Sequence, residues 1–293
     1  MIKDRTKGTI IFDIANTMLM VLLMCVTLYP IVYEAAVSFS SAQYVQANQV
    51  SLLPKGFTTD AYKKLIEYKL FWRSYINTVV YTAVGTAINL VLTSMLAFCL
   101  SRRELIFRKQ ITLFIVVTMF FSGGMIPNFL LVNWLGIYNT IWAIVLPGAI
   151  STYNMIIVRT YMSSLPEEVI ESVRLDGAND FQIFLKIVLP LSKSTLATIG
   201  LFYFVGHWNS YFLPMIYLKD KSMQPLQVIL KEMIVDQQIE SLGLTSSDIK
   251  NVMPTSEMFT AASIVLSLIP VLCAYPFVQK YFVKGVMIGS VKG

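Results

Sequence analysis

Long apolar stretches constrain the fold of this chain more than any other feature of its sequence. Six stretches of about 20 residues or more lie at residues 11–36, 76–100, 111–133, 139–162, 194–217 and 259–283. About 20 predominantly apolar residues are needed to cross the hydrocarbon core as a helix, and lipid offers backbone N–H and C=O groups no other partners. Charged residues make up only 14% of the chain. We therefore predict an all-α integral membrane bundle of six transmembrane helices, forming one domain over residues 1–293.

The distribution of basic residues predicts how the bundle is oriented. Residues 101–110 carry four Lys and Arg residues, whereas the link at 134–138 carries none. Basic residues favour the cytoplasmic side of a membrane. Placing both termini and residues 101–110 in the cytoplasm leaves 14 of the 23 Lys and Arg residues there. Residues 163–193 are then also cytoplasmic, and residues 37–75 and 218–258 form outer loops.

Two of these regions carry further local signals. Gly123-Gly124 and Pro127 interrupt the third span. In hydrocarbon such a break is tolerated where it faces protein or a water-filled cavity, so it marks either the transport pathway or a plain packing kink. The run K-E-M-I-V-D-Q-Q-I-E-S-L at 231–242 predicts a short amphipathic helix in the second outer loop.

Residues 163–190 are polar, charged and helix-forming, although they lie between two spans. Ser164 followed by Glu167 fits a capping box, with Pro166 in the first turn. Gly177 is suited to end this helix, because glycine readily adopts the left-handed conformation.

A second helix is predicted directly after that turn. Asn179 caps a helix from Asp180 to Leu189, with Gln182 at the capping-box position, and Pro190 closes it before the fifth span. The result is a helix–turn–helix segment that stands off the membrane. In the first helix, Glu171 and Arg174 offer an ion pair three residues apart. A loop that merely connects two spans is the alternative interpretation.

The spacing within this segment resembles the "EAA" loop of ABC importer permeases, written E-A-A-x3-G-x9-I-x-L-P. Glu171 and four later residues fall in register, while Ser172 and Val173 replace the two alanines. The resemblance implies that the short helix sits in a cleft of a cytoplasmic ATP-binding subunit. The coupling residues it implies are Glu167, Glu171, Ser172, Val173, Asp176, Gly177, Ile187, Leu189 and Pro190.

The end of the chain, Y-F-V-K-G-V-M-I-G-S-V-K-G, is similar to the tail of the smaller permease subunit of maltose-type (carbohydrate uptake type 1) importers. In that family the tail reaches into the ATPase dimer. The resemblance therefore implies a cytoplasmic tail over residues 284–293, with ATPase contacts at Gly289, Val291, Lys292 and Gly293. A basic tail anchored at lipid headgroups is the alternative.

The fifth span contains F-V-G-H-W-N-S-Y-F-L-P-M, which is similar to the W-N-x-F/Y-x-x-P segment of sugar permeases. Polar groups inside a bilayer are costly and often mark a substrate route, and aromatic and amide side chains suit a sugar. The candidate pathway residues are His207, Trp208, Asn209, Tyr211 and Glu34. Three alternatives stay open: a core role for His207, helix–helix hydrogen bonding through Asn209, and simple interfacial exposure of Glu34.

The segments F-S-G-G-M-I-P and V-K-G-V-M-I-G-S-V-K-G look similar to the branch that imports complex oligosaccharides, including alginate or pectic fragments. The resemblance implies a multi-pass permease of the bacterial cytoplasmic (inner) membrane that works by alternating access. Its implied partners are a second homologous permease, a homodimeric ATP-binding subunit, an extracytoplasmic solute-binding protein and an oligosaccharide. A permease for a small sugar or glycerol phosphate, or a secondary transporter, is the alternative.

Missing motifs exclude several other functions. The chain has no G-x4-G-K-[ST] phosphate loop, so we predict a transporter subunit rather than an enzyme, without a cofactor of its own. ATP and Mg²⁺ would be bound by the partner ATPase. Cys25, Cys99 and Cys273 lack metal-ligand spacing and are predicted to be buried thiols, so no metal site is expected. The basic residues flank spans in contact with membrane lipid, and no nucleic-acid surface is predicted.

Overall fold

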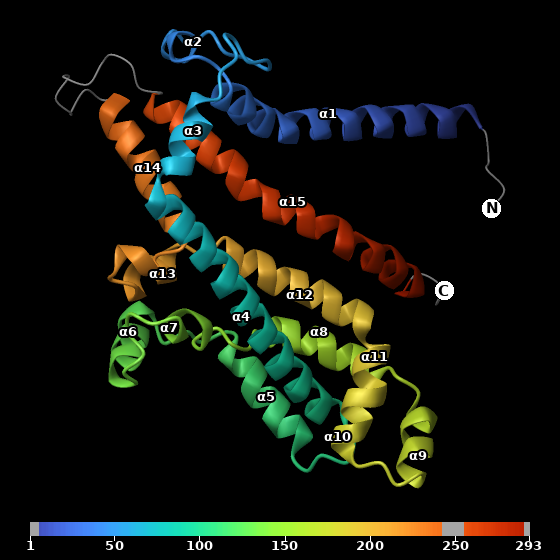
Figure 1. Cartoon of the computed structure of the whole chain (residues 1–293). Coiled ribbons are helices and arrows are strands. Elements are labelled where there is room, and N and C mark those ends of the chain that lie inside the picture. Colours follow the sequence, from blue (N-terminus) through green and yellow to red (C-terminus); the bar gives the residue numbers. More distant parts are fainter. Residues whose placement is uncertain (1–5, 242–254, 290–293) are drawn as a thin grey trace. The chain divides into compact units, whose positions relative to one another are not determined.

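The computed structural model describes residues 6–241 and 255–289, and every regular element in these ranges is a helix (Figure 1). The chain divides into two compact units, and the single permease domain stays a prediction. The first unit comprises Met1–Lys69 and Leu230–Ile269, and the second comprises Leu70–Ile229 and Pro270–Gly293.

The first unit contains the first helix of the described chain and part of the last. Its elements are α1 (Lys7–Ser38), α2 (Ala42–Gln46), α3 (Asp60–Glu67), most of α14 (Leu226–Ser241) and the N-terminal part of α15 (Ser256–Gly289). Helix α14 covers residues 231–241 of the helix predicted at 231–242, and residue 242 lies outside the described residues. The ring of Phe39 stacks on Tyr62, and Ser38 Oγ lies 2.9 Å from Tyr62 Oη. The segment between α1 and α3 is therefore folded back onto α3.

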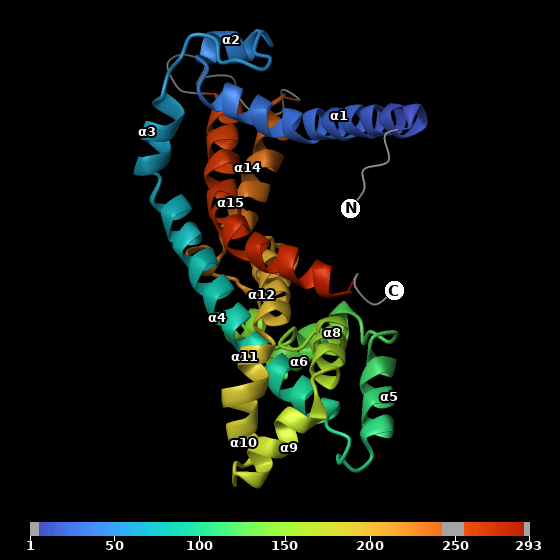
Figure 2. The same ribbon diagram turned by 90° about the vertical axis from the view of Figure 1, so that its right-hand side faces the viewer.

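The second unit is built around the long helix α4. Its elements are α4 (Lys69–Ser101, from Leu70), α5 (Arg108–Thr118), α6 (Met125–Trp134), α7 (Trp142–Val145), α8 (Thr152–Ser163), α9 (Glu167–Leu175), α10 (Asp180–Ile183), the π-helical turn η1 (Phe184–Val188), α11 (Leu189–Leu191), α12 (Lys193–Trp208), α13 (Phe212–Tyr217) and the 3₁₀ turn η2 (Lys221–Met223). Both views place α9 and α10 at one end of this unit, beside the C-terminal end of α4 (Figure 2).

One apolar core joins α9 and α10 to the helices behind them. We call it the coupling core, and its buried members are Ala97, Phe98, Leu100, Met155, Val158, Met162, Ile170, Ile183, Phe184, Val188, Ile199 and Tyr203. They come from α4, α8, α9, α10, η1 and α12. The helix–turn–helix segment is thus packed onto the bundle and does not hang from it as a free loop.

The predicted spans differ in how continuous they are. Three described helices, Lys7–Ser38, Lys69–Ser101 and Ser256–Pro276, are long and apolar enough to cross a membrane. A fourth crossing exists if the pair Asp180–Leu191 and Lys193–Trp208, bent by 82°, counts as one span. The predicted spans 111–133, 139–162 and 194–217 are each interrupted.

The interruptions have local causes. The first falls at Gly123-Gly124, as the sequence indicates, and Gly124 has φ +86°. The second, between α7 and α8, contains Pro147 and Gly148, which the sequence reading overlooked. Proline lacks the N–H that a helix needs, and glycine has the largest backbone entropy to lose. The expectation of buried cysteines is wrong for the isolated chain, in which all three thiol residues are exposed.

Tyr203 of α12 ties three helices of the second unit together. Its side chain is 6% exposed. The hydroxyl lies 2.7 Å from Thr93 Oγ1 on α4 and accepts a hydrogen bond from Ser151 N at 3.0 Å. Ser151 is also the residue that caps α8. One phenol therefore fixes α4, the start of α8 and α12 against each other.

We expect Tyr203→Phe to lower the free energy of unfolding by about 1–3 kcal/mol, because Ser151 N–H and Thr93 lose their shared partner. Thermal unfolding of the detergent-purified protein measures this loss. Tyr161→Phe is the matched control, since the Tyr161 hydroxyl makes a more exposed bond to Leu191 O at 3.0 Å. Equal losses for the two variants would contradict the role given to Tyr203.

Candidate coupling site and transport pathway

Helix α9 begins without the capping box that the sequence predicts. Its N-cap is Pro166, which makes no side-chain cap bond. Ser164 ends α8 instead, with φ −90° and ψ −4°, and its hydroxyl donates to Tyr161 O at 2.7 Å. An N-cap residue needs an extended backbone, which Ser164 does not have. The predicted capping role of Ser164 is therefore wrong.

The turn after α9 confirms the role of Gly177. Its φ is +85°, and a Cβ at this position would meet nothing within 4 Å. Glycine is therefore required for the backbone conformation and not for space. Gly177 N donates to Arg174 O and Ala178 N donates to Val173 O, at 3.0 and 3.2 Å. This pair of bonds is a Schellman motif, which satisfies the last carbonyls of the helix.

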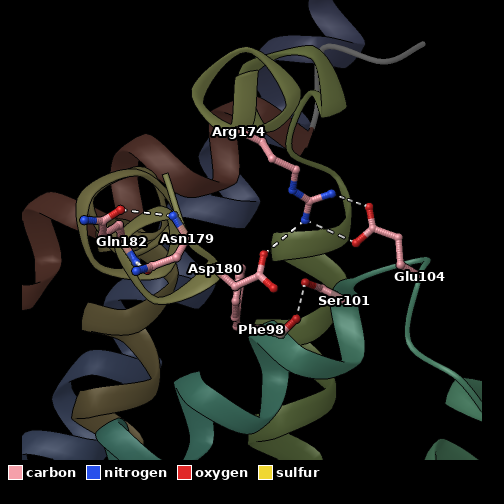
Figure 3. Close-up of polar contacts among 7 residues, drawn as sticks. All are labelled: Phe98, Ser101, Glu104, Arg174, Asn179, Asp180 and Gln182. Atoms are coloured by element: carbon pink, nitrogen blue, oxygen red, sulfur yellow. Dashed lines mark hydrogen bonds and ion pairs between the residues drawn. The ribbon is translucent and has the colours of Figure 1, made fainter. Parts of the chain in front are cut away.

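The second helix starts with the predicted capping box. Gln182 N donates to Asn179 Oδ1 at 2.9 Å, and Asn179 N donates to Gln182 Oε1 at 3.0 Å (Figure 3). The prediction that this helix stops at Pro190 is wrong. The helix continues to Leu191 through a π-helical turn over 184–188. Proline has no N–H, and its ring crowds the carbonyl four residues earlier, so a wider turn before Pro190 accommodates it.

Helix α9 has an inner and an outer face. Ile170 is 5% exposed and belongs to the coupling core, and Val173 packs against that core. Glu171 and Ser172 are exposed on the other side, and Leu175 is 89% exposed. The outer face is therefore an open, partly apolar surface, while the inner face is fixed to the bundle.

Arg174 makes the main ion pairs of this region. Its guanidinium donates to both carboxylate oxygens of Glu104, at 2.7 and 3.2 Å, and to Asp180 Oδ1 at 3.0 Å (Figure 3). The predicted pairing with Glu171 is wrong. A second ion pair joins Arg103 Nη1 to Glu167 Oε2 at 3.3 Å. The sequence reading missed Glu104 because it lies 70 residues before Arg174.

These contacts shift the ionisation of both partners. The hydrogen bonds from Arg174 hold the pKa of Glu104 below its ordinary value of 4.5, and those to Glu104 and Asp180 raise the pKa of Arg174. The contribution of Glu104 is complete above pH 4.5 and is lost as the pH falls through its lowered pKa. Since the pair is solvent-exposed, salt screens it and its effect on stability is small.

The remaining residues of the predicted coupling set are placed as follows. Leu189 packs against the coupling core, Ile187 is half-buried, and Asp176 and Pro190 are exposed. In the tail, Gly289 is the last residue of α15. The other three predicted tail contacts, Val291, Lys292 and Gly293, lie outside the described residues.

Among the pathway candidates, Trp208 lines a cavity of the second unit. It is 2% exposed, and its ring lies 5.9 Å from Tyr75 and 6.0 Å from Phe204 between centroids. The cavity has a volume of about 410 Å³ and lies against α4 and α12 of the second unit. Among its lining residues are the buried Thr82 and the half-buried Thr86, whose hydroxyls have no partner within the described residues.

The other candidates lie elsewhere. Asn209 ends α12 and is exposed, and Tyr211 is 42% exposed. Glu34 is half-buried near the end of α1 and belongs to the first unit. In the second unit, His207 and Trp208 end α12, and Asn209 and Tyr211 lie in the break before α13. Of these four residues, Trp208 lines the cavity.

His207 packs directly against α4. A Cβ at Gly85 would lie 2.5 Å from His207 Nε2 and 2.6 Å from Cε1. The glycine therefore makes room for the imidazole, and small residues commonly allow such close approach between membrane helices. Nε2 is buried and has no hydrogen-bond partner within the described part of the chain. This placement supports the core role that the sequence left open.

We expect Gly85→Ala to cost about 1–3 kcal/mol of unfolding free energy, because the added methyl overpacks the His207 contact. Adding His207→Ala to that variant should recover most of the loss. Gly206→Ala is the matched control, since a Cβ there meets nothing within 4 Å. Thermal melts of the four proteins test the contact, and a loss that His207→Ala does not relieve would contradict it.

Known proteins share this sequence and fold. Residues 89–288 match the family described as "Binding-protein-dependent transport system inner membrane component". The polygalacturonan/rhamnogalacturonan transport system permease protein YtcP of Bacillus subtilis (strain 168) is 40% identical over 97% of this chain and 99% of its own length. Protein LplC of the same organism is 38% identical over 98% of this chain and 97% of its own.

A solved structure agrees with these relatives. The chain is similar, with a TM-score of 0.85 and 38% identity, to a chain in the crystal structure of a bacterial ABC transporter involved in the import of the acidic polysaccharide alginate. The match covers 94% of this chain and 98% of that chain.

The family match and the similar solved structure identify a permease of an ABC importer, and the predicted all-helical permease fold is confirmed. The chain belongs to the family of binding-protein-dependent transport system inner membrane components, and its assignment to the carbohydrate uptake type 1 permeases is confirmed. It is a multi-pass protein of the inner membrane and a component of an ABC transporter complex, a transporter subunit and not an enzyme.

Proposed function

We propose that this permease imports acidic oligosaccharides of the pectic or alginate type. The observation that carries the proposal is the agreement between two full-length similarities. One is to a permease named for polygalacturonan and rhamnogalacturonan, and the other is to a transporter of alginate. Polygalacturonan and alginate are both polymers of uronic acids, so the two names share one chemistry. Sequence identities of 40% and 38% over nearly the whole chain support a shared substrate class.

The proposed arrangement has six crossings, with both termini in the cytoplasm. It follows from the six apolar stretches and from the 14 of 23 basic residues that fall on that side. The specific partners are a second homologous permease, a homodimeric ATP-binding subunit and an extracytoplasmic solute-binding protein. ATP and Mg²⁺ are bound by the ATP-binding subunit, and this chain carries no cofactor. The tail over residues 284–293 contacts the ATPase dimer through Gly289, Val291, Lys292 and Gly293.

Coupling in this proposal begins at the outer face of α9. Glu171, Ser172 and Leu175 enter a cleft of the ATP-binding subunit, and closure of the ATPase dimer displaces α9. Because Ile170, with Ile183 of α10, is buried in the coupling core, the displacement reaches α4, α8 and α12. The bundle then alternates between inward- and outward-facing states. ATP and the binding protein shift this equilibrium because each has a different affinity for the two states.

The proposed pathway residues are His207, Trp208, Asn209, Tyr211 and Glu34. The cavity beside Trp208 supports this placement, because its wall is almost wholly apolar and includes an indole ring that suits the apolar face of a sugar. Ligand sites are lined mostly by apolar and aromatic side chains, and the indole ring of Trp208 is of this kind.

We expect Leu175→Asp to reduce co-purification of the ATP-binding subunit about tenfold or more, because it places a charge in an apolar contact that the complex must bury. Glu171→Ala should weaken the same contact. Affinity purification through a tag on this chain, followed by quantification of the ATPase, measures both. Lys109→Ala, at an exposed position in the α4–α5 region, is the control. Full retention of the ATPase in both outer-face variants would refute the docking role of α9.

We expect the complete transporter in proteoliposomes to take up oligogalacturonides at least about tenfold faster than neutral arabino-oligosaccharides of the same length, a difference of about 1.4 kcal/mol in selectivity. Uptake of labelled sugar with internal ATP measures this preference. A preference for the neutral sugar would reject the acidic substrate class. Uptake that persists without the ATP-binding subunit would instead indicate a secondary transporter.

A further inference from the structure

The inner face of α9 carries a charged residue at each end and an apolar residue between them. Glu167, Ile170 and Arg174 are spaced at i, i+3 and i+7, so they lie on one side of the helix. Glu167 pairs with Arg103, and Arg174 pairs with the next residue of the same loop, Glu104. Helix α9 is therefore attached at both ends to the segment that follows α4, with Ile170 buried in the coupling core between the two attachments.

Arg174 makes a second attachment across the turn. Besides Glu104, its guanidinium reaches Asp180, the first residue of α10, at 3.0 Å (Figure 3). Gly177 lies between Arg174 and Asp180 and provides the left-handed bend. The single side chain of Arg174 thus joins three segments: the last turn of α9, the start of α10 and the α4–α5 loop. A rotation of α9 about Gly177 would have to break this contact.

The chemistry of arginine suits such a junction. A guanidinium is planar and presents its donors in a fixed fork, and here two of its nitrogens engage the two oxygens of Glu104. Bidentate contacts of this kind fix direction as well as distance. The cation also lies in the last turn of α9, where the helix dipole favours positive charge. The pair therefore sets the orientation of α9 on the bundle even where its contribution to stability is small.

The contacts of Arg174 separate it from the docking surface. Its donors point to the α4–α5 loop and α10, whereas Glu171 and Leu175 occupy the outer face. Removing the guanidinium should leave the outer face intact and loosen only the attachment of α9 to the bundle.

We infer that Arg174 is a positioning residue that transmits movement of α9 to α4 and α10 through Glu104 and Asp180. This inference rests on the proposed docking of α9 into the ATP-binding subunit. In this inference Arg174 couples ATP turnover to the movement of the bundle, and it has no role in binding the ATP-binding subunit.

The first test compares Arg174→Ala, Arg174→Lys and Lys109→Ala in the complete transporter. Arg174→Ala should keep the ATPase in the purified complex and keep basal ATP turnover, but lower the stimulation of turnover by loaded binding protein roughly fivefold or more. Arg174→Lys should recover only part of that stimulation, because an ammonium lacks the two-pronged geometry. Lys109→Ala should behave as the wild type.

The second test replaces the ion pair with a covalent link. Cys25, Cys99 and Cys273 are first changed to Ala, and Glu104→Cys and Arg174→Cys are then combined in that background. The double variant should be uncoupled as purified, and a short bismaleimide crosslinker should restore substrate-stimulated turnover and uptake. Each single cysteine variant, treated in the same way, should stay uncoupled.

The outcomes separate the inference from the function on which it rests. Unchanged stimulation in Arg174→Ala, or loss of the ATPase from its complex, overturns the inference, and so does a crosslinked double variant that stays uncoupled. Retention of the ATPase by the Glu171 and Leu175 variants overturns the docking role itself, whatever Arg174 does. Uncoupling with the ATPase retained, reversed by the crosslink, supports the inference.

Discussion

The burial of Ile170, Ile183 and Phe184 against the ends of α4, α8 and α12 is the interaction on which the rest of the second unit depends. In the proposed orientation these residues lie at the cytoplasmic end of the spans, where water is present. Removing apolar surface from water is favourable there, whereas inside lipid no comparable drive exists. The hydrophobic effect can therefore fasten the coupling segment to the bundle, and only a fastened segment can pass on a force applied to its outer face.

In the proposed arrangement, the part of α4 that lies inside the membrane uses a different means of association. Along α4, Asn89 donates to Gly148 O at 3.2 Å, and Thr93 Oγ1 lies 2.7 Å from the hydroxyl of Tyr203. Gly85 admits the imidazole of His207. Close approach at small residues and hydrogen bonds between helices are what lipid-embedded spans rely on. The hydroxyl and amide groups of α4 lie mostly on its buried side. The helix can therefore carry many of them and still be apolar enough to span the membrane.

Sequence reasoning succeeded where the decisive contacts are local. Gly177 and the Asn179–Gln182 capping box each depend on residues within four positions, so their spacing alone predicts them. It failed at Ser164, because this residue is the C-cap of α8 and cannot also be the N-cap of α9. It also failed at Arg174, because the carboxylate of Glu104 that Arg174 binds lies 70 residues away. The break at Pro147-Gly148 was detectable from those two residues but was overshadowed by the hydropathy of residues 139–162. The family was recognisable because its motif is formed by residues close together in the sequence. The contacts that attach the motif to the bundle join distant residues, so the sequence alone did not predict them.

Helix α12 contributes residues both to the coupling core and to the cavity of the proposed pathway. Ile199 and Tyr203 belong to the coupling core, while Phe204, the residue after Tyr203, and Trp208, four residues later, line the cavity. Leu90 of α4 likewise packs against the core and lines the cavity. A helix transmits a tilt along its length because its backbone hydrogen bonds are satisfied internally. In the proposed mechanism a displacement of α9 therefore changes the cavity lining directly, without a separate relay of side chains.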